Sequence, residues 1–193
     1  MLRLTTNKIW NRLDMCKSVY FEFFTLASNP DTKKLATLAR FVSLLHTHAL
    51  DMYPDNEDLQ NKFKGDMFEI FVEMFLKIQP ADNGFGISDY VATNYSDYGV
   101  DGYGKNVNGD TVVVQIKYKS NPTDAVTFAD LSKTFAQGVH PSHPFNIDVT
   151  RPNIVVAVTS AYVHYTAHKG LPGSILEIGN VQLRGIVNHN VTF

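Results

Sequence analysis

The chain has 193 residues, of which 44% are hydrophobic, so it is long enough to bury one sizeable core. Its formal net charge of -2 excludes a globally basic nucleic-acid-binding domain, although a local basic groove remains compatible with that charge. The single cysteine, Cys16, excludes a disulfide framework or a cysteine-based zinc site within one chain. The first residues lack an apolar leader and no later stretch is long enough to span a bilayer, so we expect a soluble, cytoplasmic protein with no membrane partner.

Two amphipathic helices are expected ahead of residue 60. Residues 11–27 and 32–52 carry apolar side chains at mixed three- and four-residue spacing, which is typical of helices packed on one side. The breaks that follow them contain proline and Asx residues, which stop helices. Asp31 and Thr32 are expected to cap the second helix. We therefore divide the chain into a helical N-terminal extension, residues 1–60, and a larger unit, residues 61–193.

Residues 62–78 are expected to form a helix that is buried on nearly all sides, because apolar residues cover most of its circumference. The remaining sector carries three carboxylates, those of Asp66, Glu69 and Glu73. The common interpretation of such a stripe is a solvated helix face, and we expect it for Asp66 and Glu73. Glu69 lies at the centre of the stripe and is the better candidate for reaching an active site.

Asp101 precedes a strand that carries two unusual polar side chains. It lies among glycines, where the backbone can bend and approach a ligand closely. A tight turn at residues 106–110 leads into residues 111–119, whose three consecutive valines indicate a buried strand. Alternation places Gln115 and Lys117 on one face, and their burial requires partners such as a carboxylate or a phosphate. We expect Asp101 on the adjacent antiparallel strand.

The rest of the chain predicts a mixed sheet with helices on its faces. Thr127 and Asp130 have the spacing of a capping box that opens a helix. A strand, a crossover helix and a second apolar strand are typical of a parallel pair within such a sheet. After that helix we expect a buried strand at residues 153–160 and a short helix that ends at residue 169. Two short strands are expected at residues 174–178 and 183–187.

These residues resemble the motifs of the PD-(D/E)xK nuclease superfamily, and within it the Mrr-like restriction endonuclease branch. The matching motifs are Gly-Asp-Met-Phe-Glu, Gly-Val-Asp-Gly, Val-Gln-Ile-Lys and a strand followed by a helix, at residues 65–69, 99–102, 114–117 and 154–169. The resemblance extends from residue 62 to residue 190 and implies a restriction-endonuclease-like central mixed sheet flanked by helices. The chain departs from the superfamily pattern at Gln115, where an acid is usual, although Gln-x-Lys is similar to the form of the Mrr-like branch.

The resemblance implies a divalent-metal-dependent DNA endonuclease in restriction, repair or recombination. Mg²⁺, or Mn²⁺ in its place, prefers oxygen ligands, which Asp101, the Gln115 side chain and the Ile116 carbonyl can supply. Lys117 would hold the attacking water and stabilise the transition state. Glu69 would bind a second ion or orient water. The implied catalytic residues are Asp101, Gln115, Lys117 and Glu69, and the implied metal ligands are Asp101, Gln115, Ile116 and Glu69.

Other interpretations stay open. A catalytically weak nuclease-fold module that binds DNA or a protein partner is the main alternative, and the modest net charge favours it slightly. Asp101 is alternatively a turn aspartate, and Lys117 a strand-end lysine that reaches solvent. His164 and His168 have the four-residue spacing of a zinc helix but lack its glutamate and a third ligand. The preferred DNA, RNA as a substrate and a homodimer are left open.

Overall fold

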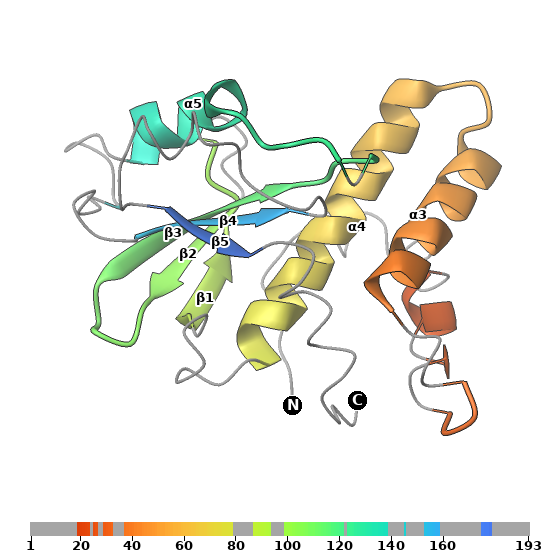
Figure 1. The fold of residues 1–193 in the computed structure, drawn as a ribbon, viewed down its shortest axis with the longest axis horizontal. Helices are drawn as coiled ribbons and strands as arrows, with labels where there is room; N and C mark the ends of the chain where they lie inside the picture. Colours follow the sequence, from red (N-terminus) through yellow and green to blue (C-terminus); the bar gives the residue numbers. More distant parts are fainter. Residues whose placement is uncertain are drawn as a thin grey trace.

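We describe a computed structural model of the chain, covering residues 19–23, 25–26, 29–32, 37–78, 87–93, 99–121, 123–138, 145, 153–158 and 175–178. The elements in chain order are α3 (Leu38–Met52), α4 (Glu57–Ile78), β1 (Ser88–Ala92), β2 (Gly102–Lys105), β3 (Thr111–Lys117), α5 (Phe128–Gly138), β4 (Ile154–Val158) and β5 (Ile175–Ile178) (Figure 1). Residues 19–23 and 25–26 are also helical. The helix expected up to residue 169, the strand expected at residues 183–187, and His164 and His168 lie outside the described residues.

The described strands form one mixed sheet in the order β1-β2-β3-β4-β5. The first three strands are antiparallel neighbours, whereas β3 pairs with β4, and β4 with β5, in parallel. Helix α5 lies in the connection from β3 to β4, as a parallel pair requires. The predicted α/β class, with a mixed sheet and flanking helices, is therefore confirmed.

Helices α4 and α5 cover opposite faces of the sheet (Figure 1). Val112, Val114 and Ile116 of β3 pack in the cluster that contains α4. Val113 belongs to the second cluster, together with Leu131 of α5. This division follows from the alternation of side chains along a strand. Gln115 and Lys117 therefore belong to the α5 face, as their spacing from Val113 predicts.

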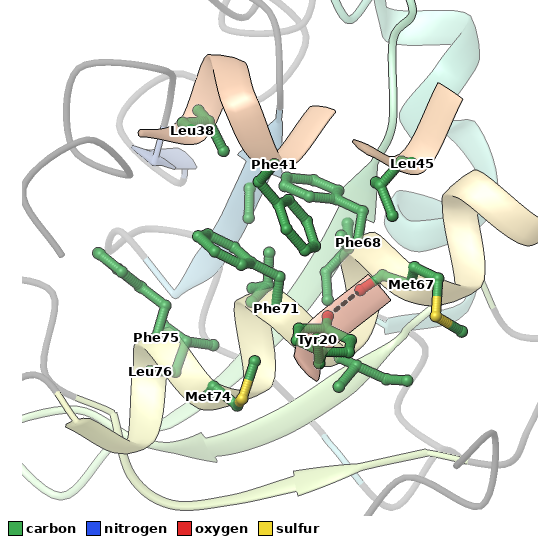
Figure 2. Close-up of a cluster of buried hydrophobic side chains, with 14 of the residues drawn as sticks. Tyr20, Leu38, Phe41, Leu45, Met67, Phe68, Phe71, Met74, Phe75 and Leu76 are labelled. Atoms are coloured by element: carbon green, nitrogen blue, oxygen red, sulfur yellow. Dashed lines mark hydrogen bonds between the residues drawn. The ribbon is translucent and has the colours of Figure 1, made fainter. Parts of the chain in front are cut away.

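Helix α4 is the central helix of the core, as its apolar circumference predicts. Its buried residues contact the sheet on one side and the more N-terminal helices on the other (Figure 2). The Phe41 and Phe71 rings stack with centroids 4.6 Å apart, and the Tyr20 hydroxyl donates to the Met67 carbonyl at 2.6 Å. Residues on both sides of residue 60 thus share one core. The division of the chain there stays a prediction.

Two helix starts differ from the predicted ones. Helix α3 begins at Leu38 because the Thr37 hydroxyl caps it, accepting a hydrogen bond from the Arg40 N–H at 3.1 Å. Thr32, the predicted cap, lies in a turn. Helix α4 begins at Glu57 instead of residue 62, since Asn56 accepts a hydrogen bond from the Leu59 N–H at 3.0 Å. Asn56, one of the Asx residues predicted to end the preceding helix, thus caps the next one.

None of the helices in the described ranges combines the length and apolar character needed to cross a membrane.

Candidate active site

Asp101 lies directly before β2 and is joined to β3 by its backbone and its side chain. Its N–H donates to the Val114 carbonyl at 2.9 Å, and its Oδ2 accepts from the Ile116 N–H at 2.6 Å. Gly102 lies opposite Val114 in the antiparallel pair of β2 and β3. The prediction that Asp101 and the Gln115–Lys117 segment meet across adjacent antiparallel strands is therefore confirmed.

The turn that positions Asp101 packs directly against α5. Gly99 has a φ of +61°, a conformation that favours glycine. A Cβ at this position would lie 2.6 Å from Cβ of Lys133. At the other end of β2, Asn106 and Gly109 close the predicted tight turn into β3 through a backbone hydrogen bond of 2.9 Å. These turns fix the register that brings Asp101 to Gln115.

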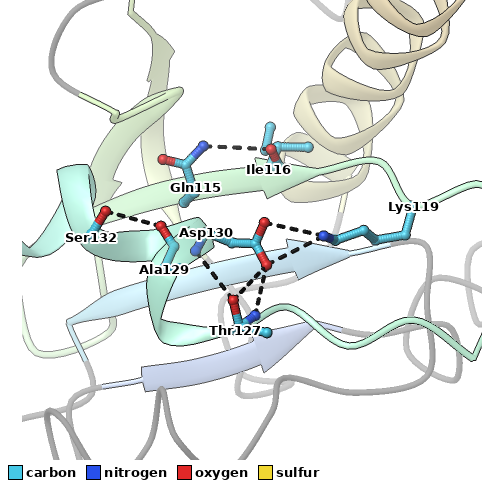
Figure 3. Close-up of polar contacts among 7 residues, drawn as sticks. All are labelled: Gln115, Ile116, Lys119, Thr127, Ala129, Asp130 and Ser132. Atoms are coloured by element: carbon cyan, nitrogen blue, oxygen red, sulfur yellow. Dashed lines mark hydrogen bonds and ion pairs between the residues drawn. The ribbon is translucent and has the colours of Figure 1, made fainter.

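Gln115 is 3% exposed, and its amide is directed at Asp101. Its Nε2 donates to Oδ2 of Asp101. The same nitrogen lies 3.5 Å from the Ile116 carbonyl oxygen (Figure 3). The Gln115 amide thus contacts both Asp101 and the Ile116 carbonyl, which are also predicted to bind the metal. The structure brings Asp101, Gln115 and Ile116 together.

Thr134 of α5 contacts the other end of the Gln115 amide. Its hydroxyl oxygen lies 2.7 Å from Oε1 of Gln115 and 2.6 Å from the Gly99 carbonyl oxygen. A hydroxyl has one proton, so it can donate to only one of these two acceptors. A half-turn of the amide satisfies both contacts, because its NH₂ group then donates to Thr134 and the Thr134 proton goes to Gly99. Thr134 was missed from the sequence, where a threonine inside a helix carries no signal of this contact.

Lys117 and Lys119 have different surroundings at the end of β3. Lys119 Nζ lies 3.1 Å from Oδ1 of Asp130, which in turn caps α5 by accepting a hydrogen bond from the Thr127 N–H at 2.8 Å (Figure 3). Lys117 is half-buried, and its ammonium makes no ion pair or hydrogen bond within the described part of the chain. Lys119 is therefore held by an ion pair with Asp130, whereas Lys117 is available to a ligand.

The capping box at the start of α5 also shifts the ionisation of Asp130. Burial alone raises the pKa of this carboxyl, but hydrogen bonds from Thr127 and Lys119 outweigh burial and leave the pKa below its ordinary value. The predicted capping box is confirmed by the reciprocal contact, in which the Asp130 N–H donates to the Thr127 hydroxyl at 3.4 Å.

The carboxylate stripe of α4 is less solvated than expected. Asp66 is 6% exposed and Glu73 is 1% exposed, so the expectation of a solvated face was wrong for both. The neighbouring helices and the sheet leave little of α4 open to water. Each carboxylate is instead compensated one turn away, Asp66 by Lys62 at 3.6 Å and Glu73 by Lys77 at 2.8 Å. Glu69, between them, is half-buried.

Tyr90 of β1 connects this stripe with Asp101. Its hydroxyl lies close to Gly102, where an added Cβ would be 2.2 Å from the hydroxyl oxygen. Burial raises the pKa of Tyr90 well above its ordinary value. Three carboxylates raise it further, in decreasing order those of Asp101, Glu73 and Glu69. Tyr90 packs in the same cluster as α4, on the sheet face opposite to Gln115.

The donor set around Asp101 fits a hard cation better than a soft one. Within the residues that the structure covers, no group of three or more His, Cys, Asp and Glu side chains is arranged to hold a metal ion. The convergent groups are instead a carboxylate, a backbone carbonyl and an amide. The half-turn of the amide that satisfies Thr134 would present Oε1 to the other two. Three oxygens are the donors that Mg²⁺ and Mn²⁺ favour.

A scan of known protein families finds none that matches this chain, and a search of curated proteins finds no relative.

Proposed function

We propose that the chain is a divalent-metal-dependent DNA endonuclease with a restriction-endonuclease-like core, hydrolysing phosphodiester bonds in restriction, repair or recombination. A cytoplasmic location belongs to the same proposal. The observation that carries it is the convergence of Asp101, the Gln115 amide and the Ile116 carbonyl beside Lys117. The site lies where a buried strand ends and a half-buried lysine has no ion pair among the described residues.

The Gln115 amide stabilises the Asp101 carboxylate when no cation is bound. With Nε2 toward Asp101, the amide donates to the carboxylate and neutralises the contact. With Oε1 toward Asp101, three oxygens meet, and a bound cation would relieve their repulsion. Asp101, Gln115 and the Ile116 carbonyl would hold Mg²⁺ in that second arrangement. A bound divalent cation supplies neutralisation of the phosphate charge and a more acidic water.

The residues of the chain supply the remaining requirements. Lys117 shares the sheet face of Gln115 and would hold the attacking water and the phosphate oxygen that gains charge. Burial of Gln115 and its contact with Thr134 of α5 hold this side chain beside Asp101 before substrate binds, which lowers the cost of positioning. The water proton passes to bulk solvent or to the phosphate, since no histidine belongs to the proposed set.

Glu69 is proposed as the additional carboxylate, acting on a second ion or on a water at the edge of the site. Glu69 is half-buried, whereas Glu73 is buried in its ion pair with Lys77. Glu69 and Asp101 both raise the pKa of Tyr90, which supports assigning Glu69 to the surroundings of Asp101.

The alternative is a nuclease-fold module that binds DNA or a protein partner and cuts poorly. The hydrogen bond from Gln115 to Asp101 favours it, because that contact occupies a ligand oxygen in the absence of a cation. The two functions are separated by one pair of measurements on the purified chain. Cleavage of linear, supercoiled, branched and methylated DNA is measured with Mg²⁺, with Mn²⁺ and with a chelator, and DNA binding is measured in parallel.

Metal-dependent cleavage of any of these substrates supports the endonuclease. Binding of DNA without cleavage in either metal supports the binding module and overturns the proposal. The absence of both binding and cleavage also overturns it.

A further inference from the structure

A polar pocket lies at the N-terminal end of α4, at the end of the helix opposite to Glu73. It has a volume of about 550 Å³ and is lined by residues of α3, of the α3–α4 connection, of α4 and of the segment after β3: His46, Pro54, Asp55, Asn56, Glu57, Gln60, Asn61, Lys64 and Ser120. Ser120 lies three residues after Lys117. The pocket therefore joins the first turns of α4 to the chain that leaves the candidate active site.

Lys64 is the unexplained residue of this pocket. It is 5% exposed, yet it makes no ion pair and no hydrogen bond among the residues that the structure describes. The other buried charges of α4 are compensated, since Asp66 pairs with Lys62 and Glu73 with Lys77. Holding an ammonium away from water without an anion costs free energy. A fold that keeps such a group beside a pocket is suited to an anionic ligand.

The polar groups around Lys64 fit a phosphate better than a metal ion. Gln60 is anchored, because its Nε2 donates to the Tyr53 carbonyl at 2.7 Å. Asn61 and Ser120 are exposed and contribute an amide and a hydroxyl, which donate hydrogen bonds to anions. Two carboxylates, Asp55 and Glu57, also line the pocket and oppose an anion, but both are exposed and remain solvated. The buried charge is positive.

We propose that the Lys64 pocket binds a phosphate group of the DNA backbone, as a contact separate from the proposed metal ligands. The choice of DNA as the ligand rests on the proposed function. The negative charge of the ligand is inferred from the buried ammonium of Lys64. The pocket also contains Ser120, three residues after Lys117, so a bound phosphate would lie beside the segment that leaves the candidate active site. Lys64 then positions the substrate and takes no part in bond cleavage.

The test compares Lys64→Met with a matched control, Lys105→Met, which removes the same charge. Lys105 is exposed and pairs with Thr111 at the opposite end of β3, about 20 Å from Lys117 at 3.3 Å per residue. Binding of a fluorescent duplex is measured over a series of salt concentrations in a chelator, so that no cleavage occurs. The salt slope of the binding constant counts phosphate contacts, at about 0.9 per contact.

Lys64→Met is expected to lower DNA affinity about tenfold and the salt slope by about 0.9, while Lys105→Met leaves both near the wild-type values. Glu57→Gln, which removes a carboxylate from the same pocket, is expected to tighten binding. Urea unfolding should show that Lys64→Met is at least as stable as wild type, since it removes an unpaired buried charge. Equal affinity and slope in Lys64→Met and wild type would overturn the proposal, and so would an equal loss in Lys105→Met.

Titration with inorganic phosphate separates DNA from a free phosphate as the ligand. Saturable shifts in the NMR signals of Gln60, Asn61 and Ser120 that disappear in Lys64→Met support a phosphate site. The same shifts with unchanged DNA binding in Lys64→Met would overturn the assignment to the DNA backbone. The chelator prevents cleavage, so this experiment tests the Lys64 contact independently of catalysis. If the chain binds DNA through Lys64 but never cuts it, the endonuclease proposal is refuted and the phosphate site at Lys64 is retained.

Discussion

The hydroxyl oxygen of Thr134 lies 2.7 Å from Oε1 of Gln115, and this contact links the orientation of a buried amide to helix α5. The same hydroxyl lies 2.6 Å from the Gly99 carbonyl. It can donate to that carbonyl and keep a hydrogen bond with the amide only if the amide presents its NH₂ group. That orientation directs Oε1 toward Asp101. Thr134 is therefore proposed to favour the arrangement of Gln115 that binds a cation.

Replacing Thr134 with valine should weaken Mg²⁺ binding, because valine has the same shape and cannot hold either end of the amide. We expect a loss of about tenfold in affinity by calorimetry, equal to about 1.4 kcal/mol. Thr134→Ser should keep most of the affinity. In a Gln115→Glu background the effect of Thr134→Val should shrink, since a carboxylate presents an oxygen in either orientation. Unchanged Mg²⁺ affinity in Thr134→Val would remove Thr134 from this role.

Replacing Gln115 itself should separate metal binding from the stability of the metal-free chain. Gln115→Glu places a second carboxylate against Asp101, so it should lower the melting temperature in a chelator and show a larger increase with Mg²⁺ than wild type. Gln115→Leu should show little increase with Mg²⁺, because it lacks the oxygen ligand. Thermal unfolding with and without Mg²⁺ measures both effects. Equal Mg²⁺-dependent shifts in the two variants would exclude Gln115 as a ligand.

Asp101 should be tested with asparagine as well as with alanine. Its Oδ2 accepts a hydrogen bond from the Ile116 N–H, so Asp101→Ala leaves a buried donor without its partner and should cost about 1–3 kcal/mol of stability. Asp101→Asn retains an oxygen acceptor and loses only the charge. We expect both variants to lose cleavage, with Asp101→Asn closer to wild type in urea unfolding. Cleavage at the wild-type rate by folded Asp101→Asn would refute its proposed role.

Glu69 and Glu73 give an internal comparison, because each loses one charge from the same helix on substitution with glutamine. Glu69→Gln should lower the cleavage rate at least about tenfold with little change in DNA affinity. Glu73→Gln should mainly lower the free energy of unfolding, by about 1–3 kcal/mol, because it weakens a buried ion pair with Lys77. Rates and unfolding curves are measured on both variants. A larger rate loss in Glu73→Gln at equal folding would assign the second carboxylate to Glu73.

The capping box of α5 predicts a pH-dependent contribution to stability. The pKa of Asp130 is lowered in the folded chain, so its stabilising effect is complete above the unfolded pKa and is lost as pH falls through the folded pKa. Asp130→Asn should cost about 0.5–1 kcal/mol at neutral pH, a magnitude typical of a partly exposed ion pair. The difference between wild type and variant should decrease below about pH 4 in urea unfolding. A difference that grows on acidification would contradict the direction of the shift.

Much of the strand geometry around the site was predictable from the sequence. Three consecutive valines marked β3 as buried, and alternation then assigned Gln115 and Lys117 to one face. The tight turn at residues 106–110 set the pairing that brings Asp101 to the same place. The capping residues Thr127 and Asp130 located the start of α5. These features depend on residues close in the chain, whose local conformations the sequence determines directly.

Contacts between distant segments were not predictable in the same way. A helical wheel shows that Glu73 is polar, but it cannot show that neighbouring elements cover it and that Lys77 compensates it. Thr134 contacts Gln115 across 19 residues of sequence, and no pattern in the sequence signals that contact. The pocket at Lys64 likewise requires the segment after β3 to reach α4. Tertiary packing decides which polar side chains are buried.

The central claim is tested most directly by the rate of DNA cleavage in Mg²⁺ by Lys117→Met beside Lys119→Met. The two variants remove the same charge two residues apart, but Lys119 is tied to Asp130, whereas Lys117 has no ion pair within the described ranges. We expect a loss of at least about a hundredfold for Lys117→Met, typical of removing a group that stabilises transition-state charge, and a change within a few-fold for Lys119→Met. Cleavage by folded Lys117→Met at the wild-type rate would contradict the central claim.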